Sequence, residues 1–343
     1  MLALAHRRRS RVHRHPLEDV GVLRLRALRI RLAVHGLADG AEVIKEHAGS
    51  RIGRDMESRT IDVLGLRTRV VQEDGRGGGD PIVLIHGVGA WAETWRAVMR
   101  PLADTGRRVI ALDLPGFGES DRPGRVRYFG PEEAFYPRFV LAAMDVLGVR
   151  RAHIAGQSMG GAIAFMAAVS APERARSLVL VAPGGLGRDV AFFLRACAIP
   201  GFGLLARMPR PRTAARDVLA TCFYDPGRIS PELVEEAARY GNASFPEFVR
   251  ALSAGVGLRG VRASIREAWL GRAAAYGGPV LITWGREDRV LPVRHLADSA
   301  RAFPQAEIRI IEHCGHLLMA ERPDEFLAAV VPFVARAEEA VAA

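Results

Sequence analysis

Hydrophobic residues occur along this chain in short continuous runs separated by longer amphipathic segments. Apolar runs at 81–85, 108–112, 177–181 and 279–284 are typical of strands that are buried on both faces of a sheet. The segments between them have helical spacing, as over 131–147, where every third or fourth residue is apolar. Strands that alternate with helices in this way predict a mostly parallel central sheet flanked by helices.

The alternation of strands and helices is preceded by a hairpin and is interrupted once. Residues 60–64 and 68–72 predict an opening antiparallel hairpin. Between 184 and 278 only helical patterns occur and no convincing strand, so we expect a helical insertion there. The alternation then resumes, with a strand over 307–311 and a final helix from about Asp324.

Length and composition fit one domain that carries an insertion. The chain has 343 residues, of which 49% are hydrophobic and 25% charged, as in ordinary globular proteins. We therefore expect a core made of residues 56–183 and 279–343, with a helical cap at 184–278. No run approaches the 18 consecutive apolar residues of a membrane-spanning helix, so we expect no transmembrane segment.

Residues 1–55 do not share this regular pattern. They hold 12 basic and 6 acidic residues, whereas the other 288 residues hold 36 and 32. The arginines of 22–34 would face both sides of a strand, which fits neither a clean amphipathic strand nor a clean helix. Three interpretations stay open: a translated upstream region before a start at Met56, a disordered basic tail, or a segment that binds a membrane surface or a partner.

The formal net charge of +10 does not indicate a nucleic-acid-binding protein. Most of the excess of basic over acidic residues lies in residues 1–55. Lys45 is the one lysine and all other basic residues are arginines, which indicates a biased composition of the coding sequence more than a surface that binds anions. The three cysteines, Cys197, Cys222 and Cys314, are far apart and match no metal-ligand spacing. We therefore expect a cytoplasmic protein with no metal, no organic cofactor and no nucleic-acid partner.

The sequence Gly156-Gln157-Ser158-Met159-Gly160 places a serine between a predicted strand and a helix-forming segment. Such a sharp turn forces the serine backbone into a strained conformation with its hydroxyl outward. Glycines are needed two residues to either side, because a Cβ there would clash with the neighbouring strand or helix. The pattern predicts an exposed nucleophile; the alternative is a glycine-rich turn around a buried serine.

A serine hydroxyl is a weak nucleophile at neutral pH and needs a base, which in turn needs an orienting carboxylate. The loop after the first strand beyond the insertion offers Glu287 and Asp288, and the loop after the last strand offers His313 and His316. The chain order is therefore serine, acid, histidine, which differs from the order in both common types of serine protease.

From about residue 58 to 337 the chain resembles the α/β-hydrolase superfamily. Five motifs occur in the order of that family: HGVG at 86–89, DLPGFGESD at 113–121, GQSMGG at 156–161, WGREDRVLP at 284–292 and CGHLLMAERPDEF at 314–326. The resemblance implies the α/β-hydrolase fold, with a mostly parallel central sheet flanked by helices and an α-helical cap insertion.

The resemblance also implies a role for each candidate of the triad. Ser158 is expected to be the nucleophile. Asp288 is expected to be the acid, in preference to Glu287, because the family pattern W-G-x-x-D ends at residue 288. His316 is expected to be the general base, in preference to His313, because it follows a glycine as in the family.

The oxyanion hole of such an enzyme needs two N–H donors close to the developing negative charge. The helix that starts after the serine offers the N–H of Met159, and the loop at 86–89 offers that of Val88, with Gly89 as the fallback. His86 and Asp113 are expected to be structural, since each lies in a motif beside the site but is not in the triad.

Hydrolysis of a carboxylic ester with a small to medium apolar acyl group, through an acyl-enzyme, is the default interpretation. The apolar residues of the insertion either pack together or line the substrate pocket, and they also fit a membrane-surface lipase. Those considered are Phe192, Phe193, Ile199, Phe202, Leu204, Leu205 and Met208. The partner is then a small apolar ester or acyl compound, and the protein is a candidate homodimer.

Two alternatives remain. Residues 183–187, PGGLG, are similar to a motif of the C–C bond hydrolases that cleave vinylogous diketone ring-fission products, although Gln157 and Leu317 stand where those enzymes usually have Asn and Trp. A non-catalytic apolar-ligand-binding protein on the same fold is the alternative of another class. Epoxide hydrolase and dehalogenase chemistry is disfavoured, because those relatives carry aspartate as the nucleophile.

Overall fold

The computed structural model describes residues 56–130, 134–199, 201–202 and 212–339. The predictions for 1–55, and those for Leu204, Leu205 and Met208, lie outside the described residues.

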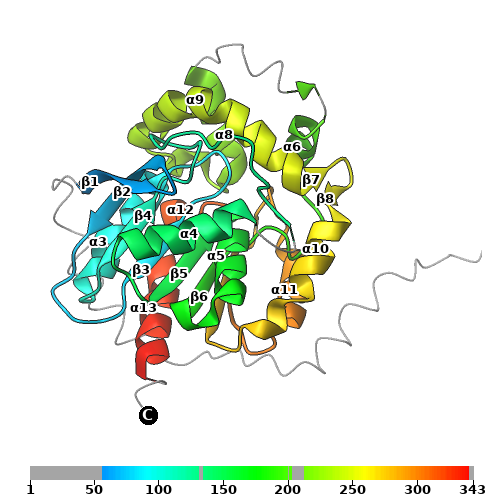
Figure 1. Ribbon diagram of the computed structural model, residues 1–343. Helices are drawn as coiled ribbons and strands as arrows, with labels where there is room; N and C mark the ends of the chain where they lie inside the picture. The colour runs from blue at the N-terminus through cyan, green and yellow to red at the C-terminus, as the bar shows by residue number, and fades with distance from the viewer. Residues whose placement is uncertain (1–55, 131–133, 200, 203–211, 340–343) are drawn as a thin grey trace, which may run out of the picture. The chain divides into compact units, whose positions relative to one another are not determined.

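An eight-stranded sheet forms the centre of the described chain (Figure 1), in the order β1-β2-β4-β3-β5-β6-β9-β10. β1 pairs antiparallel with β2, and β2 with β4, while every other neighbouring pair is parallel. The mostly parallel sheet predicted from the sequence is therefore confirmed. The strands are β1 (Glu57–Val63), β2 (Leu66–Glu73), β3 (Ile82–Ile85), β4 (Val109–Leu112), β5 (Ala152–Gln157), β6 (Ala175–Val181), β9 (Val280–Gly285) and β10 (Glu307–Ile311).

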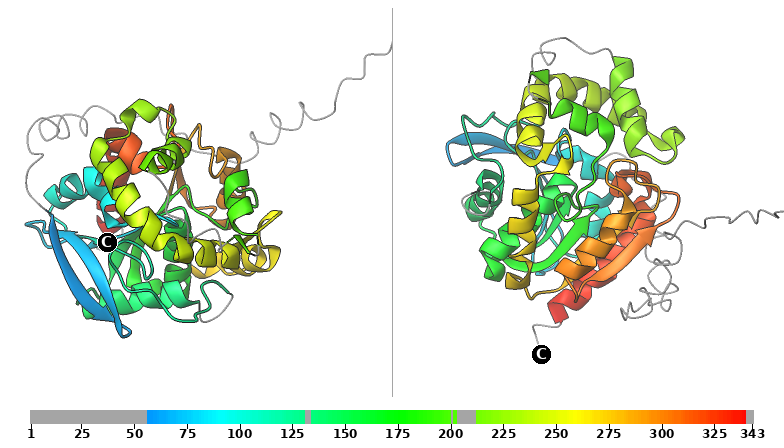
Figure 2. Two further views of the ribbon diagram at one scale, coloured as in Figure 1. Left: turned by 90° about the horizontal axis from the view of Figure 1, so that it is seen from above. Right: turned by 90° about the vertical axis from the view of Figure 1, so that its right-hand side faces the viewer.

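Helices cover both faces of this sheet. One face carries α4, α5 and α11, and the other carries α3, α12 and α13 (Figures 1 and 2). α5 is apolar around its whole circumference, and all of Met159–Val169 is buried, as expected of a helix enclosed by sheet and neighbours. The helices are α3 (Arg96–Asp104), α4 (Phe135–Val146), α5 (Met159–Ser170), α11 (Leu296–Ala302), α12 (Leu318–Glu321) and α13 (Pro323–Glu339).

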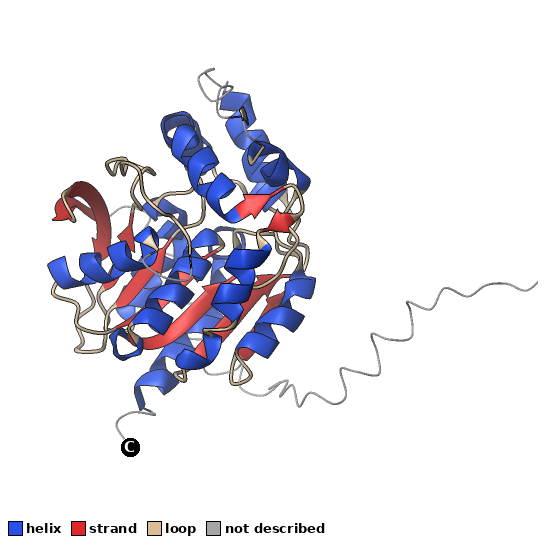
Figure 3. Ribbon diagram, turned by 45° about the vertical axis from the view of Figure 1, so that its right-hand side comes forward, coloured by secondary structure: helices blue, strands red, loops and turns tan. Residues whose placement is uncertain are grey.

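The chain between β6 and β9 forms a separate group of elements at one end of the sheet (Figures 1 and 3). A short hairpin, β7 with β8, interrupts the helices, so the prediction of no strand in this stretch was wrong. Two-residue strands are too short to leave an alternating pattern in the sequence. The elements are α6 (Phe192–Cys197), α8 (Arg212–Cys222), α9 (Pro231–Gly255), β7 (Val256–Gly257), β8 (Gly260–Val261) and α10 (Ala263–Leu270).

α9 is a single helix of 25 residues. It begins where Ser230 Oγ accepts a hydrogen bond from the Leu233 N–H, with Pro231 at the first helical position. It continues through Pro246, which removes one backbone donor, because its apolar face stays buried on both sides of that residue. This continuation carries α9 to the hairpin and over the end of β5.

A buried histidine fixes the C-terminal helix to the opposite end of the sheet. His153, at the start of β5, lies 2.8 Å from Ser177 Oγ through Nδ1 and 3.3 Å from Glu338 through Nε2. Burial lowers the pKa of His153 to about 4. The folded chain therefore holds this imidazole neutral across the range in which an exposed imidazole takes up a proton.

We predict that the free energy of unfolding falls as the pH is lowered from about 6.5 to about 4. In this window the unfolded chain binds a proton at His153 that the folded chain does not, and one such site contributes at most about 1.4 kcal/mol per pH unit. The free energy of unfolding is measured by denaturant titration at several pH values. In His153→Asn its slope against pH should be smaller by the contribution of about one bound proton. His313→Gln, at an exposed histidine, is the control; an equal change in both variants would contradict the assignment.

Candidate active site

Ser158 lies at the sharp turn between β5 and α5. Its φ of 55° and ψ of −117° are strained for a residue with a side chain. A Cβ on Gly156 would overlap the carbonyl oxygen of Gly160, and a Cβ on Gly160 would overlap that of Ile85. The strained serine and the need for both glycines, predicted from the sequence, are confirmed.

His316 and Asp288 come from the two loops that the sequence indicated. His316 Nδ1 lies 2.7 Å from Asp288 Oδ2, and both side chains are buried. The other carboxylate oxygen of Asp288 accepts the N–H groups of Val290 at 2.8 Å and Leu291 at 2.9 Å. A carboxylate held in this way accepts the Nδ1 proton and leaves Nε2 of the neutral imidazole as an acceptor.

The rival residues of the same loops lie elsewhere. Glu287 accepts the N–H of Cys314 at 3.0 Å and so ties the two loops together. His313 is exposed, with its ring 5.5 Å from that of Tyr224. Neither is bonded to the His316 imidazole, so the Asp288–His316 pair is the one that these two loops form.

Gln157, next to the serine, connects β5 to the histidine loop. Its Nε2 donates to the carbonyl oxygen of His316 at 3.1 Å, and its Oε1 lies against Gly87, where a Cβ would overlap it. In the part of the chain that the structure describes, no hydrogen bond joins Ser158 Oγ to His316. Such bonds are often long in unliganded hydrolases and shorten when substrate binds.

The loop at 86–89 lies directly beside the serine, since a Cβ on Gly87 would be 3.1 Å from Ser158 Cβ. Val88 and Met159 line the same cavity as Ser158. Their N–H groups donate to no acceptor among the described residues, so both remain free to bind a ligand oxygen. Gly89 has a φ of 75° and packs against Phe248, at the far end of the loop.

His86 holds this loop from behind. Its Nε2 accepts the N–H of Leu114 at 3.0 Å, so Nδ1 carries the proton and donates to the Gly87 carbonyl at 2.7 Å. Burial lowers the pKa of His86 to about 4, which keeps it neutral in this role. The expected structural role is consistent with these contacts.

Asp113 also has structural contacts. It accepts N–H groups from Ala92 at 2.7 Å and Glu119 at 2.9 Å, and it lies 3.3 Å from the Arg69 guanidinium. Burial raises its pKa to about 6. These bonds fix the loop that follows β4, away from the cavity.

Glu321 is a residue of the site that the sequence did not single out. This buried carboxylate accepts three backbone N–H groups: those of Tyr224 at 3.1 Å, Asp225 at 2.7 Å and Gly315 at 2.7 Å. The Cys222 carbonyl accepts the His316 N–H at 2.6 Å. The histidine loop is therefore held from outside the core, by the end of α8 and the segment that follows it.

The cavity above Ser158 contains about 580 Å³ of empty space, part of it open to solvent, and lies between the core and the elements that connect β6 to β9. Ser158 is the sole hydroxyl in its lining, and no charged side chain among the described residues lines it. Its walls are apolar: Val88, Phe129, Met159, Ala162, Val190, Leu194, Ala251, Leu252, Val256, Val261, Ile265, Trp269 and Leu291, with Gly184, Gly185 and Gly255.

The sequence pointed to other residues of the insertion as pocket candidates. Phe192, Phe193, Ile199 and Phe202 do not line the cavity, and Phe192 is 76% exposed. α6 is too short to turn all its apolar residues inward, and Leu194 is the one that reaches the cavity. Most of the lining residues within 184–278 belong instead to the second half of α9, the hairpin and α10.

The described residues contain no cluster of three or more histidine, cysteine or acidic side chains that could hold a metal ion. None of their helices combines the length and apolar character required to cross a bilayer.

The chain matches one family model and is similar to several known proteins. The family model for the alpha/beta hydrolase fold matches residues 80–218 and 230–323. A 2-hydroxy-6-oxononadienedioate/2-hydroxy-6-oxononatrienedioate hydrolase of Comamonas testosteroni is 32% identical over 80% of this chain and 95% of its own length. The dihydrolipoyllysine-residue acetyltransferase component of the acetoin cleaving system of Cupriavidus necator is 33% identical over 77% of this chain, which spans 66% of that protein.

A solved structure of similar extent is that of a membrane phospholipase A described as a bacterial virulence factor. It is 25% identical to this chain, with a TM-score of 0.68 over 93% of this chain and 97% of the other.

We predict that Glu321→Gln lowers kcat about tenfold or more with little change in KM, because one of three N–H groups loses its acceptor and the histidine loop shifts. The measurement is steady-state hydrolysis of a p-nitrophenyl ester, together with the melting temperature. Glu325→Gln, at an exposed position of α13, is the matched control. A kcat equal to that of the control would show that Glu321 does not position the loop.

Proposed function

Because the chain belongs to the α/β-hydrolase family, we propose that this hydrolase cleaves a carboxylic ester with a small to medium apolar acyl group. The single observation that carries the proposal is an apolar cavity whose lining includes a strained serine, Ser158, that is otherwise buried. The elements at 184–278 serve as its cap, since they supply one wall of that cavity.

The reaction uses five groups of the site. Ser158 Oγ attacks the ester carbonyl while His316 Nε2 takes its proton, and Asp288 stabilises the imidazolium. The N–H groups of Val88 and Met159 bind the oxyanion. The ester C–O bond breaks as His316 returns the proton to the leaving alkoxide, and water activated by the same histidine then releases the acid.

The chemistry of the cavity lining favours an ester over the substrates of the C–C hydrolases. The Comamonas testosteroni relative is named for a dioate, which carries two carboxylates. A buried carboxylate needs a cation or several N–H donors. The described lining offers no cation, so an apolar acyl group fits it better.

C–C bond hydrolysis is the second candidate. It is favoured by the 32% identity to that relative and by the PGGLG segment, whose Gly184 N–H donates to the Ser158 carbonyl at 2.9 Å. The same nucleophile and base would act on a vinylogous diketone. A 2-hydroxy-6-oxodienoate assayed beside the esters distinguishes the two candidates.

We predict that the full chain hydrolyses p-nitrophenyl esters and that Ser158→Ala lowers kcat/KM at least a thousandfold. Ser177→Ala is the matched control, because that hydroxyl also contacts a histidine that in turn contacts a carboxylate, but at the other end of the sheet. Turnover of the dienoate in the absence of ester turnover would favour the C–C reaction. A chain inactive on both would indicate a binding protein.

We also predict that the size of the cavity sets the preferred acyl length. Ala251→Phe fills the cavity and should move the optimum to shorter chains, whereas Trp269→Ala should move it to longer ones. Each methylene that an apolar pocket binds or excludes changes the binding free energy of the transition state by about 1–3 kcal/mol. The measurement is kcat/KM across acetate to laurate esters. An unchanged profile in both variants would place the acyl group outside this cavity.

A further inference from the structure

The elements that form the cavity wall also carry an exposed face. Val190, Leu194, Val256 and Val261 point into the cavity from the segment before α6, from α6 itself and from the hairpin. Between them in sequence, Phe192 on α6 is 76% exposed and Leu258 at the hairpin tip is 68% exposed. We name Phe192, Leu258, Arg188, Arg259 and Arg262 the outer patch.

Hydrogen bonds join the segment before α6 to the hairpin. The Val261 N–H donates to the Arg188 carbonyl at 2.9 Å, so the segment before α6 runs along β8. The Arg188 guanidinium donates to the carbonyl of Arg259 at 3.1 Å, next to Leu258. Arg188 therefore lies against the hairpin, and α6, which carries Phe192, contacts β7 of the same hairpin.

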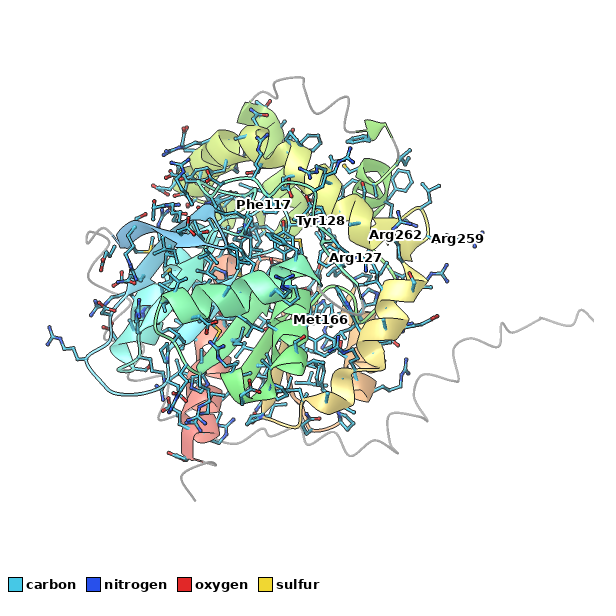
Figure 4. All side chains as sticks on the ribbon, in the orientation of Figure 1. Phe117, Arg127, Tyr128, Met166, Arg259 and Arg262 are labelled. Atoms are coloured by element: carbon cyan, nitrogen blue, oxygen red, sulfur yellow. The ribbon has the colours of Figure 1, made fainter. Side chains whose placement is uncertain are left out.

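The charge of the outer patch is not neutralised. Arg188, Arg259 and Arg262 are exposed, and none forms an ion pair with a described carboxylate. Arg262 donates to the Ser253 carbonyl at 2.9 Å, and Figure 4 shows it beside Arg259 at the side of the molecule where the hairpin meets α10. The neighbouring Asp189 is already paired with Arg294 at 2.8 Å.

We propose that the outer patch binds an anionic lipid surface. Arginines at a membrane interface attract anionic headgroups, while projecting Phe and Leu side chains enter the acyl boundary. Two exposed apolar side chains on adjacent elements, beside three arginines with no carboxylate partner among the described residues, match this chemistry, and the same elements form a wall of the cavity. Surface binding of this kind does not depend on the ester reaction, although it would bring apolar acyl groups close to the cavity.

The test is sedimentation of the full chain with sucrose-loaded vesicles, of phosphatidylcholine alone or mixed equally with phosphatidylglycerol. The wild type should bind the mixed vesicles at least tenfold more tightly than the neutral ones. Phe192→Ser with Leu258→Ser, and Arg188→Glu with Arg259→Glu, should each weaken binding to the mixed vesicles at least fivefold.

Matched controls separate the patch from general effects. Leu64→Ser with Val146→Ser removes two side chains that are 54% and 53% exposed elsewhere, and Arg59→Glu with Arg138→Glu reverses two exposed arginines elsewhere. Because every variant keeps residues 1–55, their basic charge cannot produce a difference between variants. The controls should bind the mixed vesicles as the wild type does.

Three outcomes overturn the proposal: no vesicle binding by the wild type, equal binding by patch and control variants, or capture of a protein partner by the patch in place of lipid. Hydrolysis of soluble p-nitrophenyl butyrate without vesicles should be unchanged in all these variants. If the wild type does not hydrolyse this ester but its vesicle binding still depends on the outer patch, the proposal of ester hydrolysis is wrong and the proposal of lipid binding is supported.

Discussion

The strained backbone of Ser158 is the constraint on which the rest of the structure depends. A positive φ at a residue with a side chain costs free energy, and the surroundings must hold it in place. They do so by close packing: Gly156 and Gly160 let β5, α5 and β3 approach without a Cβ between them, and Gly87 brings the next loop against the serine. The same contacts that impose the strain leave the N–H groups of Val88 and Met159 beside the hydroxyl.

The candidate catalytic residues and most of the cavity lining come from different parts of the chain. Ser158, Asp288 and His316 stand on loops of the sheet, whereas eleven of the seventeen residues that line the cavity belong to 184–278, seven of them to α9, the hairpin and α10. The two parts are joined by buried bonds, above all those of Glu321 and of the Cys222 carbonyl to the histidine loop. A change in residues 184–278 can therefore alter both the shape of the cavity and the position of His316.

Much of this could be predicted from the sequence, because the signals were local. Buried strands leave continuous apolar runs, and the serine turn leaves glycines at fixed positions. The bonds of Glu321 and Gln157 were not predicted, since their partners are 6 to 159 residues away and no pattern marks a carboxylate or amide that bonds to backbone. The apolar composition of α6 likewise does not predict that Phe192 faces outward and Leu194 inward. The packing of α6 against its neighbours determines which of its side chains are buried.

The proposed reaction requires Ser158 to be the nucleophile at the end of the apolar cavity. The most direct measurement is reaction with a hexyl p-nitrophenyl phosphonate, in which a bond from Oγ to phosphorus forms and p-nitrophenolate leaves. We expect one equivalent of p-nitrophenolate per chain, loss of ester hydrolysis, and the hexyl phosphonyl mass on the peptide that contains Ser158. Labelling of another residue, or full activity after the reaction, would contradict the account.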